Sequence, residues 1–120
     1  KKCIEYAKAG VTWLDINNYA KSILASGMKK LGFIKEDNEL IKYYFHSIGH
    51  SLGLDVHDPS IYAQGLVEGM VITIEPGLYI EELGIGIRIE DNIVITKDKA
   101  IVLSKDIIKE IEDIEKFMER

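Results

Sequence analysis

A helical repeat of apolar side chains runs through residues 16–31 of the chain. Apolar residues recur there every three or four positions, which is the spacing of one face of an α-helix. Thr12 and Asp15 precede the repeat at the spacing of a capping box, with Asp15 in place of the usual Glu. Gly32 stands where a left-handed residue ends a helix. The pattern predicts a helix that begins after Thr12 and ends before Gly32.

Short apolar segments in the later part of the chain predict strands. We expect these strands at residues 41–45, 70–75, 78–80, 85–96 and 100–103. Apolar and polar residues alternate strongly in the longest segment, and Asp91-Asn92 in its middle predicts a bulge or a tight turn.

The two ends of the chain predict further helices. Residues 1–9 have the pattern of the last part of a helix closed by Gly10, and an amphipathic helix is expected from about Asp106. No internal repeat or linker divides the 120 residues. Helices and short strands within one unit predict the α+β fold class.

Composition and charge narrow the possible classes of function. Hydrophobic residues make up 47% of the chain and charged residues 29%, as in folded proteins rather than disordered ones. The net charge of −5 argues against a nucleic-acid partner, which would require clustered Lys and Arg. No apolar stretch is long enough to span a membrane. The single cysteine, Cys3, cannot form an internal disulfide, so we expect a cytoplasmic protein.

All three histidines lie in one short window, at His46, His50 and His57. Histidine is the commonest metal ligand and the usual proton carrier near neutral pH. The four-residue spacing of the first two would align them on a helix or on an extended strand. Gly49 and Gly53 argue against the helix. The alternative is a loop whose histidines have no joint role.

Two acidic residues lie at the ends of apolar segments. Burial of a carboxylate there costs free energy unless the carboxylate has a partner. Glu75 ends the run at 70–75, and strand periodicity sets Arg88 and Glu90 on one face of the segment at 85–96. A structural Arg88–Glu90 ion pair, with Glu75 capping a turn, is one interpretation. The other is a metal site formed by His50, Glu75 and Glu90, whose ligand types suit Zn²⁺, Mn²⁺ and Co²⁺ alike.

Three segments, HSIGHSLGLDVHDP, LVEGMVITIEPGLYI and GIGIRIEDNIVIT, together resemble the M24 metallopeptidase family of methionine aminopeptidase, aminopeptidase P and prolidase. The resemblance extends over about residues 3–109. It implies the pita-bread fold, a curved antiparallel sheet covered by helices. Residues 1–120 would form the carboxyl-terminal half of the catalytic domain, and the amino-terminal half with two Asp metal ligands would precede residue 1.

The resemblance also implies roles for individual residues. His50, Glu75 and Glu90 match three of the five ligands of a two-metal centre, and Glu90 matches the ligand that bridges both ions. Glu75 would also act as the general base. The metals would be Mn²⁺, or else Co²⁺ or Zn²⁺, and we expect the 120 residues alone to bind metal weakly and to be inactive.

The substrate side of the site follows from the same resemblance. His57 matches a catalytic histidine that contacts the substrate and donates to the oxyanion, and His46 and Arg88 match residues that bind the position after the scissile bond. The forms EPGLYI and GIRIEDNIVIT resemble the branch that cleaves Xaa-Pro peptides, although Ser51 replaces a usual glycine. We therefore expect a peptide substrate and a homo-oligomer. A non-catalytic peptide- or protein-binding module and a methionine aminopeptidase remain alternatives.

Overall fold

The long helix forms where the apolar repeat predicts it. The computed structural model describes residues 1–119, and in it helix α2 (Trp13–Lys30) begins after Thr12. Thr12 and Asp15 form both hydrogen bonds of the capping box, and Gly32 follows the helix with a φ of +80°. The prediction for this helix is confirmed, because local capping and side-chain periodicity agree with the tertiary structure.

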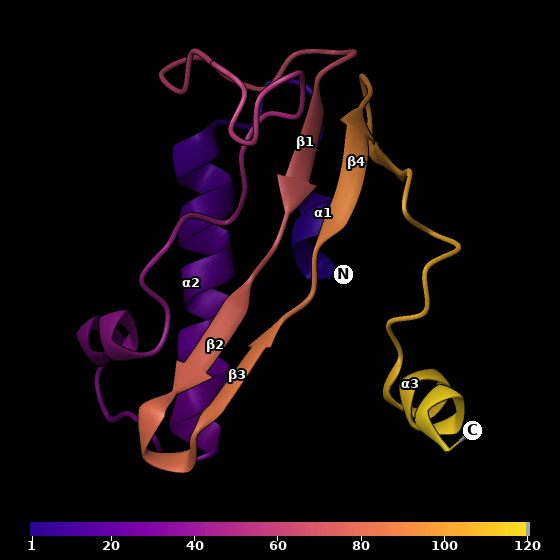
Figure 1. Ribbon diagram of the computed structural model, residues 1–120. Helices are drawn as coiled ribbons and strands as arrows, with labels where there is room; N and C mark the ends of the chain where they lie inside the picture. The colour runs from indigo at the N-terminus through magenta and orange to yellow at the C-terminus, as the bar shows by residue number, and fades with distance from the viewer. Residues whose placement is uncertain (120) are drawn as a thin grey trace.

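The strands form two small antiparallel sheets. The first sheet has the order β1-β4-β5 and contains β1 (Val71–Ile74), β4 (Asp91–Ile95) and β5 (Ala100–Val102). The second is a hairpin of β2 (Gly77–Ile80) and β3 (Ile85–Arg88), connected by the 3-10 helix η2 (Glu81–Leu83). Figure 1 shows that the paired strands β1 and β4 continue along the molecule into the pair β2 and β3.

The chain crosses between the two sheets twice, and each crossing carries an acid. Glu75 lies between β1 and β2 on the outward path, and Glu90 lies between β3 and β4 on the return. Because β1 pairs with β4 and β2 pairs with β3, the two crossings lie opposite each other. The sheet topology therefore brings together two acids that are separated in the sequence.

Two strand predictions are wrong. The segment at 85–96 forms two strands, and its interruption falls at Ile89-Glu90 because Asp91-Asn92 already pairs with β1. Residues 41–45 form no strand. The first two of them end the 3-10 helix η1 (Asp37–Lys42) and the rest follow it. The two tyrosines of this segment are buried by packing in a cluster with α2 rather than by joining a sheet.

Both terminal helices are shorter than predicted. Helix α1 spans Lys2–Tyr6, and α3 spans Ile111–Met118 instead of starting near Asp106. The residues before α3 are held by β4, because Ser104 Oγ donates to Asp91 Oδ1 at 2.5 Å and Lys109 Nζ binds the same oxygen. This attachment competes with helix formation in the residues just before Ile111.

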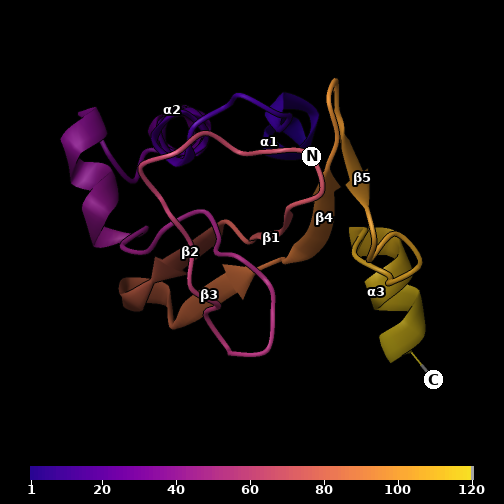
Figure 2. The same ribbon diagram turned by 90° about the horizontal axis from the view of Figure 1, so that it is seen from above.

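The main core lies between the two amino-terminal helices and the first sheet. Figure 2 shows α1 and α2 on the same side of the strands. Strand β4 buries every second residue, so that one of its faces packs against the core. The side chains that meet there are Cys3, Ala7, Trp13, Ile16, Ala20, Ile72, Ile74, Ile93 and Ile95.

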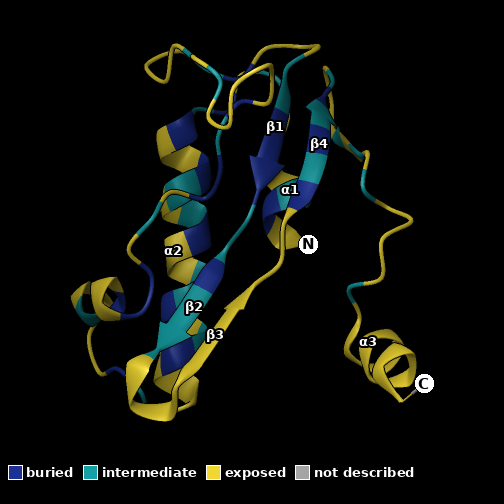
Figure 3. Ribbon diagram, viewed as in Figure 1, coloured by how far each residue is buried: buried dark blue, intermediate teal, exposed yellow. Residues whose placement is uncertain are grey.

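Several apolar side chains remain exposed on β3 and α3, both of which are exposed along their length (Figure 3). Ile85 and Ile87 of β3 and Ile111 of α3 line one groove of about 580 Å³. Within residues 1–119, none of the helices combines the length and the apolar character that crossing a membrane requires.

Candidate metal centre

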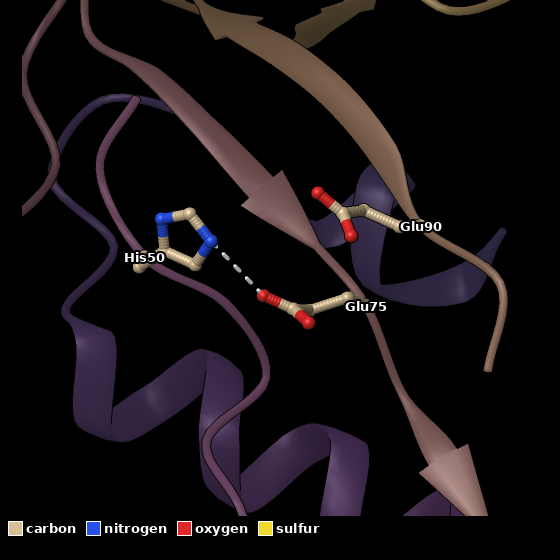
Figure 4. Close-up of side chains that lie close together, drawn as sticks. All are labelled: His50, Glu75 and Glu90. Carbon is tan, nitrogen blue, oxygen red and sulfur yellow. Dashed lines mark ion pairs between the residues drawn. The ribbon is translucent and has the colours of Figure 1, made fainter. Parts of the chain in front are cut away.

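His50, Glu75 and Glu90 come together at the crossings between the sheets (Figure 4). One possible ligand atom from each residue lies within 4.8 Å of the other two. The side chains of His50 and Glu75 are largely buried, with 17% and 14% of their surface exposed, whereas Glu90 is exposed. The structure thus assembles the three residues that the sequence predicts as metal ligands.

The loop that carries His50 runs in extended form beside β1. Glu75 N donates to Ile48 O at 2.7 Å, Thr73 N to His50 O at 2.9 Å, and Leu52 N to Val71 O at 3.0 Å. The extended alignment of the histidine window is therefore the one that forms, and the helical one does not.

Gly49 explains how closely the loop approaches the strand. A Cβ atom at this position would lie 2.0 Å from the backbone oxygen of Thr73. No side chain fits into that space, so only glycine allows the main chain on either side of it to hydrogen-bond with β1.

The hydrogen bonds of His50 define which ring nitrogen faces the acids. Nδ1 lies 2.9 Å from the carbonyl oxygen of Ser51, which can only accept, so Nδ1 carries the proton. The lone pair of Nε2 then points toward Glu75 Oε1, 3.3 Å away. Two acceptors at this distance require a proton or a cation between them.

This arrangement fits a divalent metal ion. Ligand atoms bound at about 2.1 Å around a tetrahedral ion lie roughly 3.4 Å apart. The separation of 3.3 Å between His50 Nε2 and Glu75 Oε1 is close to that value. One imidazole and two carboxylates also form a chemically suitable set of donors.

A second group of side chains lies at the Arg88 end of the site. Arg88 Nη1 donates to Tyr79 Oη at 3.3 Å, and that hydroxyl lies 3.1 Å from His46 Nε2. The other ring nitrogen of His46 faces the Ser47 carbonyl at 2.8 Å, so Tyr79 donates to Nε2. The hydrogen bond with Tyr79 raises the pKa of Arg88 above its ordinary value.

Arg88 also approaches one of the acids. This acid is Glu75, whereas the ion pair considered from the sequence joined Arg88 to Glu90. Its Nε lies 3.9 Å from Glu75 Oε2, on the carboxylate oxygen that does not face His50. At this distance the ion pair is a long, partly exposed contact. Glu75 therefore meets His50 with one oxygen and Arg88 with the other.

His57 reaches the site from an exposed loop. Its ring centroid lies 4.6 Å from that of His50, with the rings nearly perpendicular at 78°. Asp58 closes this loop, since its Oδ1 accepts the Leu54 N–H at 3.0 Å and Gly53 packs against its carboxylate. The loop thus holds an exposed imidazole over the candidate centre.

These groups line one cleft of about 660 Å³. Its walls are formed by Phe45, His46, Ser47, Gly49, His50, His57, Tyr62, Glu75, Tyr79 and Arg88. Five of the six residues predicted from the sequence line this cleft, and the sixth, Glu90, lies within reach of two of them.

Thr73 and Tyr79 contact the site residues but were not predicted as site residues. Thr73 Oγ1 donates to Glu75 Oε1 at 3.0 Å, and Tyr79 connects Arg88 with His46. For Thr73, strand periodicity was the feature of the sequence that could have indicated a place in the site. It lies two residues before Glu75 in an extended segment and therefore on the same face.

Similarity to known proteins agrees with this geometry. Residues 1–97 match metallopeptidase family M24. Xaa-Pro aminopeptidase 3 of Rattus norvegicus is 38% identical over 136 residues, covering 100% of this chain and 27% of that protein. A solved structure from Bacillus anthracis has a TM-score of 0.93 and 57% identity, over 98% of this chain and 28% of the other.

Aminopeptidase P of Escherichia coli, solved with the inhibitor Pro-Leu, matches with a TM-score of 0.88 and 38% identity, over 98% of this chain and 31% of that one. The same enzyme has been solved with zinc substituted and product bound.

The chain belongs to metallopeptidase family M24. Its fold is the α+β pita-bread fold of aminopeptidase P, with antiparallel sheets. Membership of this family implies divalent metal ions. The chain spans about 30% of the length of the relatives described above.

Proposed function

We propose that residues 1–120 are the carboxyl-terminal part of the catalytic domain of a metal-dependent Xaa-Pro aminopeptidase or dipeptidase. The full-length protein would remove the first residue of peptides that have proline in second position. The main support is that possible ligand atoms of His50, Glu75 and Glu90 lie within 4.8 Å of one another in a chain of this family. The relatives named as Xaa-Pro aminopeptidases support the substrate class.

These three residues would hold the metal together with two Asp ligands outside this chain. We propose two ions, with Mn²⁺ ahead of Co²⁺ and Zn²⁺. Divalent cations, when bound, lower the pKa of a bound water molecule and polarise the scissile carbonyl group. With three of five ligands, the isolated 120 residues would bind metal weakly and would not turn over substrate.

Glu75 is proposed as the general base. Its carboxylate lies in the cleft, and Thr73 and Arg88 contact its two oxygens, so its orientation is restrained on both sides. It would accept the proton of the attacking water, as positioned carboxylates do in other hydrolases. His57 is proposed to donate a hydrogen bond to the oxyanion that develops on the substrate.

The Arg88 end of the cleft is proposed to bind the residue after the scissile bond. His46 and Arg88 are both held by the Tyr79 hydroxyl, which fixes their spacing. Phe45 packs on Tyr79 with ring centroids 5.0 Å apart and adds an apolar wall. An apolar wall next to hydrogen-bonding groups suits a proline ring whose neighbouring peptide groups are polar.

Two further assignments accompany this function. We propose that the full-length protein is a homo-oligomer, because exposed apolar residues on β3 and α3 leave surface for association. We propose the cytoplasm as its location, since the one cysteine, Cys3, is buried and unpaired.

Peptide hydrolysis by the Mn²⁺-loaded full-length protein tests the proposed function. We expect release of the first residue from Ala-Pro-Ala, with little release from Ala-Ala-Ala or Met-Ala-Ser. Release of methionine from Met-Ala-Ser in preference to the proline peptide would instead identify a methionine aminopeptidase. Binding of Ala-Pro-Ala without hydrolysis would identify a peptide-binding module.

A further inference from the structure

Thr73 joins two of the proposed metal ligands through a single hydroxyl group. Its side chain is fully buried in β1, with 0% exposure, next to the loop that carries His50. The hydroxyl accepts the backbone N–H of His50 at 2.9 Å and donates to Glu75 Oε1 at 3.0 Å. One buried polar atom therefore contacts both a histidine ligand and a carboxylate ligand.

The direction of these two hydrogen bonds is fixed by their chemistry. A threonine hydroxyl has one hydrogen, and a backbone N–H can only donate. The hydrogen of Thr73 is therefore directed to Glu75 Oε1, which is also the oxygen that faces His50 Nε2 at 3.3 Å. Rotation of the Glu75 carboxylate away from His50 would break a buried hydrogen bond, which is costly.

Thr73 also fixes the backbone of the histidine loop. Its own N–H donates to the carbonyl oxygen of His50 at 2.9 Å, so the two residues share two hydrogen bonds. Gly49 lies against the Thr73 carbonyl with no room for a side chain. The loop cannot slide along β1 without breaking these contacts.

We propose that Thr73 is a positioning residue of the metal centre, which sets the Glu75 carboxylate and His50 in their relative places before a cation binds. This inference rests on the proposed function of the two ligands. Hydrogen-bonding partners behind metal ligands restrict ligand orientation and thereby raise metal affinity. Thr73 would do this for two ligands at once, from a buried position that does not line the cleft.

Thr73→Val removes the hydroxyl and keeps the shape of the side chain, whereas Thr73→Ser keeps the hydroxyl. Calorimetric titration of the metal-free full-length protein with Mn²⁺ measures the effect. We expect the Kd of Thr73→Val to rise about 10–100-fold and Thr73→Ser to retain most of the wild-type affinity. Thr96→Val is the matched control and should leave the Kd unchanged, because within residues 1–119 the Thr96 hydroxyl bonds only to Lys99 in a turn.

Thermal unfolding of the metal-free proteins separates positioning from a general loss of stability. Wild-type affinity in Thr73→Val would overturn the inference and leave the proposed function intact. Equal losses of affinity in Thr73→Val and Thr73→Ser, parallel to their losses of thermal stability, would also overturn it. If Thr73→Val does not fold, Thr73→Ala takes its place. A wild-type protein that binds no Mn²⁺ would instead refute the proposed function.

Discussion

At the scale of single residues, Glu75 has the most informative surroundings in the site. Thr73 Oγ1 and His50 Nε2 face its Oε1 at 3.0 Å and 3.3 Å, and Arg88 Nε lies 3.9 Å from its Oε2. Its side chain is 14% exposed, so it borders the cleft without lying open to bulk water. A carboxylate restrained in this way suits both metal binding and proton transfer.

Glu75→Gln tests this residue directly. Glutamine fills the same space, and its amide oxygen can still accept the Thr73 hydroxyl, but it cannot take up a proton from water. We expect kcat of the full-length protein on Ala-Pro-Ala to fall by about 10²–10⁴-fold, while circular dichroism shows an unchanged fold. Glu68→Gln, at an exposed position outside the cleft, is the control and should keep wild-type turnover. Full turnover by Glu75→Gln would refute its role as the base.

Residue chemistry explains which site residues the sequence could reveal. Histidines and carboxylates in apolar or glycine-rich segments are visible as anomalies, and the structure brings His50, Glu75 and Glu90 together. Thr73 and Tyr79 are ordinary residues for a strand. Periodicity sets Thr73 on the same face as Glu75, but the importance of both residues depends on hydroxyl partners that only the tertiary structure supplies.

At the scale of elements, the site depends on two crossings between sheets and on one closely packed loop. The crossings set Glu75 opposite Glu90, and the loop beside β1 supplies His50. Gly49 permits the approach of this loop to the strand. An added side chain there would push His50 away from both acids.

Gly49→Ala and Gly27→Ala form a matched pair of glycine substitutions. The new Cβ at position 49 would lie 2.0 Å from the Thr73 backbone oxygen, whereas at position 27, inside α2, it would meet nothing within 4 Å. We expect Gly49→Ala to lower the free energy of unfolding by about 1–3 kcal/mol or more and Gly27→Ala to raise it by about 1 kcal/mol. Urea unfolding of the full-length protein measures both, and equal effects would show that the loop does not pack as described.

The same elements show why local signals predict some of the fold and fail for the rest. The capping box and the apolar repeat act within one helix, so α2 formed with the predicted limits. The division of residues 85–96 into two strands depends on pairing with strands earlier in the chain. The late start of α3 depends on the contact of Lys109 with Asp91, which no local pattern encodes.

At the scale of the whole molecule, the chain has the fold of its relatives over about 30% of their length. Glu90 lies exposed at the edge of the cluster, and apolar side chains of β3 and α3 also face outward. The exposed position of Glu90 agrees with a metal centre that is completed by ligands from elsewhere in a longer protein, and the exposed apolar residues leave surface for association. The proposed two-metal site therefore belongs to the full-length protein rather than to these 120 residues alone.

The stoichiometry of Mn²⁺ binding is the most direct test of the proposed metal centre. Metal-free full-length protein would be titrated calorimetrically beside His50→Ala and, as a matched control within the same cleft, His46→Ala. We expect two Mn²⁺ per chain for the wild type and for His46→Ala. We expect the loss of one site in His50→Ala, because His50 faces the acids and His46 faces Tyr79. Unchanged stoichiometry and affinity in His50→Ala would contradict the assignment of the metal centre.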